Sequence, residues 1–286
     1  MKKQTANKLL CLLLAVLLLA GQVLPALALN QEGGTITIAT AEDLKELAVQ
    51  CTLDSWSQGK TVVLTDDINL SGSGFTPIPT FGGTFDGQGH TISGLTITGS
   101  GNTRGLFRYV QQGAVVQNLT VKASIGPSDR KNEVAAIAGS NSGIIRQCAA
   151  QGGVKGGDSV GGVVGINERT GQVINCTFSG SVTGEHYVGG IAGRNLGSLI
   201  QCRNSGSVNT TEVETEKDLT NVDWEQLNSA ENMPASTDIG GIAGWSSGIL
   251  QSCSNSGPVG YAHVGYNIGG VVGRQSGYLD GCSNSG

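Results

Sequence analysis

Residues that carry common catalytic chemistry are scarce in this chain. Only three of its 286 residues are histidine, and His90, His186 and His263 are scattered, with no H-E-x-x-H motif among them. That motif places two zinc ligands and a general base on one helix face, so these histidines do not predict zinc-dependent hydrolysis. We expect no catalytic residue, no cofactor-binding residue and no metal ligand in this chain.

Charged and aromatic side chains are also few. Charged residues make up 14% of the sequence and aromatic residues 5%, and the formal net charge is −5. No basic stripe is present that could neutralise phosphates, which argues against nucleic acid and against an anionic membrane surface as partners. The acidity concentrates in Thr210 to Asp238, where eight acidic residues stand against Lys217 alone.

Long hydrophobic runs are absent except at the N-terminus. A lysine-rich start precedes an apolar run from Leu9 to Leu19, and Ala26 and Ala28 supply the small residues of a cleavage site. The run is shorter than the ~20 residues that a membrane span needs. We therefore predict a signal peptide in residues 1–29, a secreted or cell-surface location, and no membrane span after cleavage.

Against these absences stands a repeated glycine-rich motif. Its copies are VAAIAG from Val134, VGGVVG from Val160, VGGIAG from Val188, IGGIAG from Ile239 and IGGVVG from Ile268. A sixth and more diverged copy, GLFRYV, begins at Gly105, and successive starts lie 29, 26, 28, 51 and 29 residues apart. A period of this length is typical of a solenoid. The glycines supply either φ > 0 at tight corners or room for close approach between coils.

Positions after each start repeat as well. An apolar residue lies eleven residues on, a corner residue thirteen on, and a cysteine or leucine fourteen on, with two extra residues in the copy from Val160. Glycine and valine follow at eighteen and twenty, an alternation typical of a β-strand with one buried face. The corner residues are Asn118, Gln147, Asn175, Gln201, Ser252 and Gly281.

Short strands, corners and the absence of a helical period predict an all-β fold, namely a right-handed parallel β-helix in which each copy is one coil. A β-propeller is the alternative architecture. Its repeats are typically ~40 residues or more and carry a tryptophan signature, and neither property is found here.

Five cysteines share the position that follows the corner. They are Cys148, Cys176, Cys202, Cys253 and Cys282. Side chains stacked in register would have Cβ atoms about 4.8 Å apart, wider than the ~3.8 Å typical of a disulfide. We interpret this column as small buried hydrophobes with reduced thiols, in preference to a disulfide framework or a zinc site.

A short helix is predicted before the repeats. Thr40 can cap it, and Leu44, Leu47, Ala48 and Cys51 fall on one face. Such a helix can cover the first coil, whose strand edges and core would otherwise be open. Cys51 is therefore predicted to be a core residue of this helix.

The pattern divides the chain into three parts. Residues 1–29 are the signal peptide, residues 30–104 the cap helix with the first coils, and residues 105–286 the repeat coils. An acidic insertion occupies residues 210–238, within the repeat that starts at Val188. Because the sequence stops part-way through a coil, we expect the protein to continue beyond Gly286.

Two copies resemble a known repeat family. VGGIAGRNLGSLIQCRNSGSV and IGGIAGWSSGILQSCSNSGPV are similar to the GLUG motif of bacterial exported proteins, and GGTFDGQGHTISGLTITG resembles the segment that precedes such repeats. The resemblance spans roughly residues 35 to 286. It implies a surface adhesin-like protein or the non-catalytic repeat region of an immunoglobulin-A-cleaving metallopeptidase, without catalytic residues in this segment. The acidic insertion departs from the compact motif.

These observations favour a non-catalytic, exported surface or adhesion module that presents a repetitive β-helix to a glycan or to a protein of the host or cell surface. Exposed aromatic residues are the candidate contacts, although an aromatic residue of this kind more often serves simple packing. They are Trp224, Trp245, Tyr261 and Tyr266. The alternatives are the stalk of a larger zinc peptidase and a β-helix polysaccharide lyase, the latter by analogy of fold.

Carboxylates close to the repeat starts support the enzyme alternative. Glu133, Asp158, Glu185 and Asp238 lie one to three residues before successive starts, with His186, Arg130 and Lys131 nearby. Carboxylates grouped at one corner could hold Ca²⁺ or supply an acid and a base. A solvated corner is the simpler interpretation of the same pattern.

Overall fold

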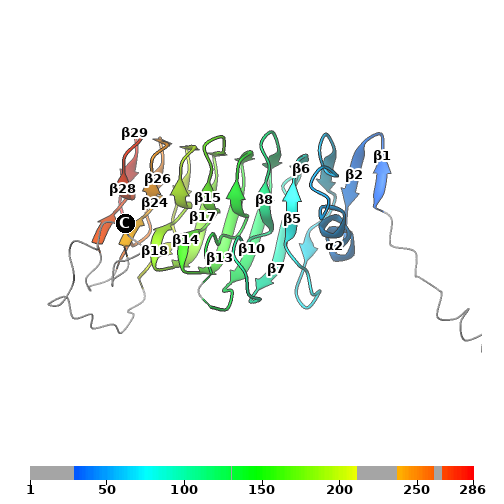
Figure 1. Ribbon diagram of the computed structural model, residues 1–286, viewed down its shortest axis with the longest axis horizontal. Helices are drawn as coiled ribbons and strands as arrows, with labels where there is room; N and C mark the ends of the chain where they lie inside the picture. The colour runs from blue at the N-terminus through cyan, green and yellow to red at the C-terminus, as the bar shows by residue number, and fades with distance from the viewer. Residues whose placement is uncertain (1–28, 130, 211–236, 261–265) are drawn as a thin grey trace, which may run out of the picture.

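The computed structural model describes residues 29–129, 131–210, 237–260 and 266–286. It is an elongated parallel β-solenoid, in which strands of successive copies stack side by side along the long axis (Figure 1). The predicted parallel β-helix is thereby confirmed. The predicted signal peptide lies outside the described residues, and so does most of the acidic insertion.

Two long sheets, A and B, form two sides of the solenoid. Sheet A has ten strands: β1 (Asn30–Glu32), β2 (Thr35–Ile38), β3 (Thr61–Leu64), β6 (Thr84–Asp86), β9 (Val115–Gln117), β12 (Ile144–Arg146), β16 (Gln172–Ile174), β20 (Ser198–Ile200), β25 (Ile249–Gln251) and β29 (Tyr278–Asp280). Sheet B has nine strands: β4 (Ile68–Asn69), β7 (Thr91–Ile97), β10 (Thr120–Ile125), β13 (Ala149–Lys155), β17 (Thr177–Thr183), β21 (Arg203–Asn204), β22 (Ser207–Val208), β26 (Ser254–Asn255) and β30 (Ser283–Asn284).

Two further sheets, C and D, complete each coil. Sheet C has seven strands: β5 (Ile78–Phe81), β8 (Phe107–Val110), β11 (Ala138–Asn141), β15 (Val164–Asn167), β19 (Ala192–Asn195), β24 (Ala243–Ser246) and β28 (Val272–Gln275). Sheet D has four strands: β14 (Asp158–Gly161), β18 (His186–Gly189), β23 (Thr237–Gly240) and β27 (Tyr266–Gly269). The chain passes through sheets D, C, A and B in that order in each later coil.

The register of the strands follows the alignment of the repeats. In sheet A, Ile145 pairs with Val173 and Val173 with Leu199, so the two extra residues before Val173 are accommodated outside the strand. The diverged copy is the exception. The structure pairs Arg104 with Val134, so that copy starts one residue before Gly105, where the sequence motif placed it.

The predicted cap helix is present as α2 (Ala41–Gln50). Thr40 Oγ1 accepts a hydrogen bond from the Asp43 amide at 3.1 Å, and Asp43 Oδ2 accepts one from the Thr40 amide at 2.9 Å. This reciprocal capping box satisfies two backbone N–H groups that a helix start otherwise leaves free. Leu44 and Leu47 on the inner face of α2 are fully buried, and the helix contacts β5 at the end of sheet C (Figure 1).

The predicted corner residues all have left-handed backbone angles. Asn118, Gln147, Asn175, Gln201, Ser252 and Gly281 have φ between 52° and 60°. A second column of left-handed residues lies at the start of each coil and consists of Thr103, Glu133, Ser159, Tyr187, Asp238 and Asn267. Left-handed angles are uncommon outside glycine, and Asn and Asp adopt them more easily than most other residues. Two such corners turn each coil.

The motif glycines serve close approach instead. They do not have positive φ, and a Cβ atom at Gly193 would lie 2.3 Å from the backbone carbon of Ser159 in the preceding coil. A Cβ at Gly190 would lie 2.3 Å from the side chain of Asn204 on the other side of the interior. The second of the two sequence explanations is therefore correct for the repeat motif.

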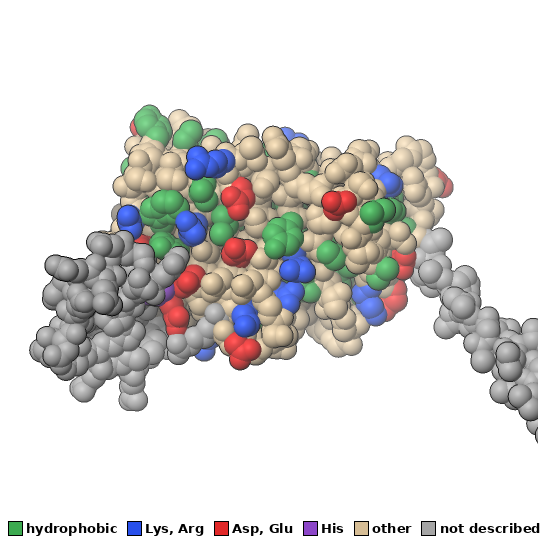
Figure 2. Space-filling model, viewed as in Figure 1, with side chains coloured by type: hydrophobic (Ala, Val, Ile, Leu, Met, Phe, Trp, Pro, Cys, Tyr) green, Lys and Arg blue, Asp and Glu red, His purple; other side chains and the backbone are tan. Residues whose placement is uncertain are grey.

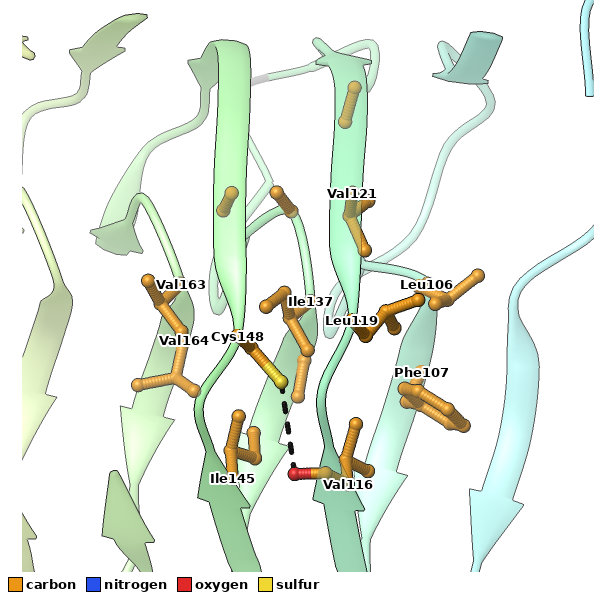
Figure 3. Close-up of a cluster of buried hydrophobic side chains, with 14 of the residues drawn as sticks. Leu106, Phe107, Val116, Leu119, Val121, Ile137, Ile145, Cys148, Val163 and Val164 are labelled. Atoms are coloured by element: carbon orange, nitrogen blue, oxygen red, sulfur yellow. Dashed lines mark hydrogen bonds between the residues drawn. The ribbon is translucent and has the colours of Figure 1, made fainter. Parts of the chain in front are cut away.

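The core consists of columns of small apolar side chains. Figure 3 shows Leu119 and Cys148 pointing into the same cluster as Val116, Ile137 and Ile145. The Cys148 thiol donates to the Val116 carbonyl at 3.8 Å and lies 3.2 Å from the carbonyl of residue 146. The position after the corner is therefore a buried column, as the sequence predicts.

All the cysteines in the described residues are free thiols. Cys51, Cys148, Cys176, Cys202 and Cys253 are buried, and only the last of the column is half-exposed. Burial raises the pKa of Cys176 and of Cys202 well above the ordinary thiol value, because the thiolate would lose its hydration. These thiols act as small hydrophobes that also satisfy a backbone carbonyl.

Two ladders of asparagine run through the interior. In sheet C, Asn141 donates to Asn167 at 2.9 Å, and Asn167 donates to Asn195 at 2.8 Å. In sheet B, Asn204 donates to Asn255 at 2.8 Å, and the same pattern continues in the next coil. The amides of Asn141, Asn167, Asn204 and Asn255 also donate to a backbone carbonyl of their own corner, and that of Asn195 to the Ile249 carbonyl of the next coil, so these buried polar groups are satisfied.

Candidate functional site

The sequence-predicted contact residues fall in different places. Trp224 and Tyr261 lie outside the described residues. Tyr266 begins β27 of sheet D, and Trp245 lies half-buried in β24 of sheet C. Of the four, only Trp245 can be examined with its surroundings.

Trp245 is part of a cluster of two aromatic rings and one guanidinium. The Arg194 guanidinium carbon lies 4.9 Å from the centre of the Trp245 ring and 5.0 Å from the centre of the Tyr187 ring. The two rings are themselves 6.3 Å apart with an interplanar angle of 57°. We call these three residues the Arg194 site. Both contacts are within the range of cation–π attraction.

Neighbouring coils bring the three residues together. Arg194 in β19 is the direct register partner of Trp245 in β24, and Arg274 in β28 follows Trp245. Tyr187 comes from a left-handed corner with φ 56°. This corner is left-handed in every copy of the repeat, so the fold fixes the position from which the Tyr187 side chain leaves the backbone.

Arg194 carries a charge that no described residue neutralises. Its Nε atom is buried without a hydrogen-bond partner, and it makes no ion pair with any described residue. Hydrophobic and basic side chains lie together on the face shown in Figure 2, over the part of the molecule where β24 and β28 are labelled in Figure 1. A half-buried guanidinium that contacts aromatic rings and forms no ion pair with a described residue can bind an anion through its exposed part.

The acidic residues before the repeat starts do not gather at one point. Glu133 and Asp238 belong to the same column of left-handed corners, but two coils separate them, while Asp158 and Glu185 precede that column by one and two residues. Asp238 is buried, and the amide of Asn267 donates to its Oδ1 at 2.8 Å. Across the described ranges no three His, Cys, Asp or Glu side chains could hold a metal ion. Among the described residues, the carboxylates near the repeat starts therefore do not form a calcium site.

A serine-hydrolase spacing occurs twice and has no nucleophile geometry. Gly-x-Ser-x-Gly surrounds Ser159 and Ser246. In hydrolases this spacing exposes the serine on a sharp turn between a strand and a helix. Both serines here are buried in strands, and the Ser246 hydroxyl accepts from Asn195 Nδ2 at 3.1 Å. The spacing arises from the glycines of the repeat.

Sequence reasoning missed two of the three residues of the Arg194 site. Tyr187 stands one residue before the repeat start at Val188, and Arg194 six residues after it. The tyrosine does not recur at its position in the other copies, whereas arginine recurs at the position of Arg194 as Arg274 in the copy from Ile268. The available signal was the alignment of Arg194 with Trp245 in the next copy, which predicts neighbours in a parallel solenoid.

The fold defines a parallel β-solenoid repeat protein, and the comparisons with known proteins agree. The family model described as the GLUG motif matches residues 156–183 and 184–209. This confirms the resemblance found in the sequence, and the chain carries GLUG motifs.

Two known proteins are similar to this chain. Halomucin of Haloquadratum walsbyi is 41% identical over 125 residues, which cover 38% of this chain and 1% of halomucin. The crystal structure of a candidate immunoglobulin A1 protease from Bacteroides ovatus has a TM-score of 0.59 at 17% identity, over 88% of this chain and 78% of that chain. At that identity the second likeness shows the fold alone.

None of the described helices is long and apolar enough to cross a bilayer.

Proposed function

We propose that this chain is a non-catalytic, exported module of the cell surface that binds a glycan or a protein through the side of its solenoid. The observation that carries the proposal is the Arg194 site, where strands β18, β19 and β24 hold two aromatic rings and a charge that forms no ion pair with a described residue. Sites built on regular elements hold their geometry better than sites on loops.

An extracellular or cell-surface location is supported by two independent observations. The first is the similarity to halomucin. The second is the signal peptide predicted from residues 1–29. A rigid rod of stacked coils is suited to presenting a binding face away from the place where the chain is anchored.

A second candidate is the non-catalytic stalk of a larger peptidase, which the structural neighbour favours. In that case the described coils still supply no hydrolytic residue, and the chemistry belongs to another domain. Intact mass and peptide sequencing of the native secreted product separate the two candidates. A linked H-E-x-x-H domain supports the stalk, and further repeats with a wall-attachment segment support the surface module.

The binding proposal is tested with the purified chain on a panel of immobilised neutral glycans, acidic glycans and glycoproteins. We expect saturable binding to at least one class, and weaker binding by a Trp245→Ala variant that retains the circular dichroism spectrum of the wild type. Absence of binding to the whole panel would reject the proposal. Cleavage of any panel polysaccharide, followed as new reducing ends, would show an enzyme instead.

A further inference from the structure

We infer that the Arg194 site (Tyr187, Arg194 and Trp245) binds the carboxylate or sulfate group of an acidic polysaccharide. This inference rests on the proposed function and names the class of ligand. The carboxylate of a uronic acid and the sulfate of a sulfated sugar share the chemistry that a guanidinium recognises, namely planar or tetrahedral oxygen acceptors with negative charge.

The charge of Arg194 is the first part of the argument. A guanidinium has five N–H donors, and those of most buried or half-buried arginines are met by carboxylates or carbonyls. Here the described residues offer ring faces to Arg194 and leave its Nε without an acceptor. Ring faces orient a guanidinium without neutralising it, so its charge stays available to a ligand. The exposed Arg274 one coil further adds a second positive charge on the same sheet.

The aromatic rings are the second part. Tyr187 and Trp245 are both half-buried, so part of each residue is in contact with solvent. Sugar rings present C–H groups that pack on aromatic side chains, while the polar ends of Tyr and Trp can form hydrogen bonds. A sugar with a charged substituent could therefore contact a ring and the guanidinium at once.

The third part is the continuation of this face along the axis. Tyr109 in β8 lies in the same register column as Arg194, with Ser140 and Ile166 between them. Three strand spacings of about 4.8 Å place them about 14 Å apart. Tyr109 is 43% exposed, and the Arg108 guanidinium carbon lies 5.6 Å from its ring centre. Two pairs of a cation and an aromatic ring on one face suit a linear polymer that lies along the solenoid.

The experiment compares three polymers as probes: polygalacturonate, dextran sulfate and unmodified dextran. Binding of the full chain is measured by isothermal titration calorimetry at two salt concentrations. We expect binding to polygalacturonate, to dextran sulfate or to both, weaker at the higher salt because exposed charges are screened. Which of the two charged polymers binds identifies the source of the anion.

Variants test the location. Arg194→Gln removes the charge at similar volume and is expected to weaken binding at least about tenfold, as for the loss of one charge-assisted hydrogen bond. Arg194→Lys keeps a positive charge but loses the forked donor geometry of the guanidinium. Its affinity is expected to lie between those of the wild type and Arg194→Gln. Arg203→Ala is the matched control, because Arg203 is an exposed arginine in β21 of sheet B. It is expected to bind as the wild type does.

Each of the following outcomes would overturn the inference. Equal binding to dextran and dextran sulfate would show that the anion is not recognised. Unchanged binding by folded Arg194→Gln would show that Arg194 serves packing only. Where this variant fails to fold, Tyr109→Ala with Arg108→Gln gives the second test on the same face, and unchanged binding there rejects the linear site. A chain that binds only neutral glycans or proteins keeps the proposed function and loses this inference, whereas a chain that binds nothing loses both.

Discussion

At the scale of single residues, the corners show how this chain turns without glycine. Five of the six predicted corner residues are Asn, Gln or Ser with φ near 53°, and only Gly281 is glycine. A short polar side chain can bond to nearby backbone and so offset part of the cost of the left-handed conformation. The sequence predicts the corner, because its polar residue recurs at a fixed place. The sign of φ came only from the structure.

Ser252 offers a test of this corner. Ser252→Gly is expected to stabilise the protein slightly or leave it unchanged, since Gly281 occupies the same place in the next coil. Ser252→Val is expected to lower the free energy of unfolding by about 1–2 kcal/mol, because a β-branched side chain disfavours φ of 55°. Urea titrations of both variants measure the difference, and equal midpoints would contradict it.

The buried thiols give a prediction about pH. Burial raises the pKa of Cys51 from 9.0 to about 11, so the folded state holds this proton more tightly than the unfolded state does. The resulting stabilisation is fully present below pH 9 and is lost as the pH rises from 9 to 11, by up to about 3 kcal/mol. Urea midpoints at pH 8, 9, 10 and 11 measure the loss. Cys51→Ala should show a smaller decrease over the same range, and an identical decrease would reject this cause.

At the scale of elements, the repeat is a device for stacking backbones closely. Where the motif has a second glycine, as in Gly190 and Gly241, the residue sixteen after the start is Asn204 or Asn255. In the copy from Val134, alanine (Ala136) replaces the second glycine, and the facing residue is Ala150, which is smaller than asparagine. The two positions thus vary together in volume. The sequence analysis identified the glycines and the strand alternation but did not predict the buried asparagines, because asparagine is usually a surface residue.

Gly193 provides the test for close approach. Gly193→Ala would place Cβ 2.3 Å from the carbon and 2.4 Å from the nitrogen of neighbouring backbone, neither of which can rotate away. We expect a loss of several kcal/mol in the free energy of unfolding or a failure to fold, as for overpacking in a rigid core. Gly126→Ala is the control, since no atom lies within 4 Å of its Cβ. Thermal unfolding followed by circular dichroism compares the two, and similar melting temperatures would refute the role assigned to Gly193.

At the scale of the whole molecule, α2 closes one end of the stack. Its inner face covers the interior beside β5, where the first coil has no preceding coil to pack against (Figure 1). An uncovered end would expose apolar columns and free strand edges, which promote association between chains. The helix was predictable because it depends on local signals: a capping threonine and apolar residues at helical spacing.

Introducing charged residues on the inner face of α2 tests whether the helix covers the end of the solenoid. The double variant Leu44→Asp with Leu47→Asp is expected to release the helix and to lower the melting temperature, since two unpaired carboxylates cannot be buried there. Sedimentation velocity should then show association of the uncovered ends. Val49→Asp on the same helix is the control, as Val49 is 60% exposed and its variant should behave as the wild type. If the Val49→Asp variant also associates, loss of the cap is not the cause of association.

The sequence by itself determined the solenoid, its period, its corners, its cap helix and its column of thiols, because in a stack of coils each residue meets its equivalents one period away. Only the tertiary structure decided which side chains contact each other across the interior of a coil, and which contact each other from non-equivalent positions of the repeat. Asn204 under Gly190, and Tyr187 beside Arg194 and Trp245, depend on the angles of the corners and on side-chain directions. The separation of Glu133 from Asp238 has the same origin: residues near equivalent starts share a corner only if their offsets are equal and their coils are adjacent.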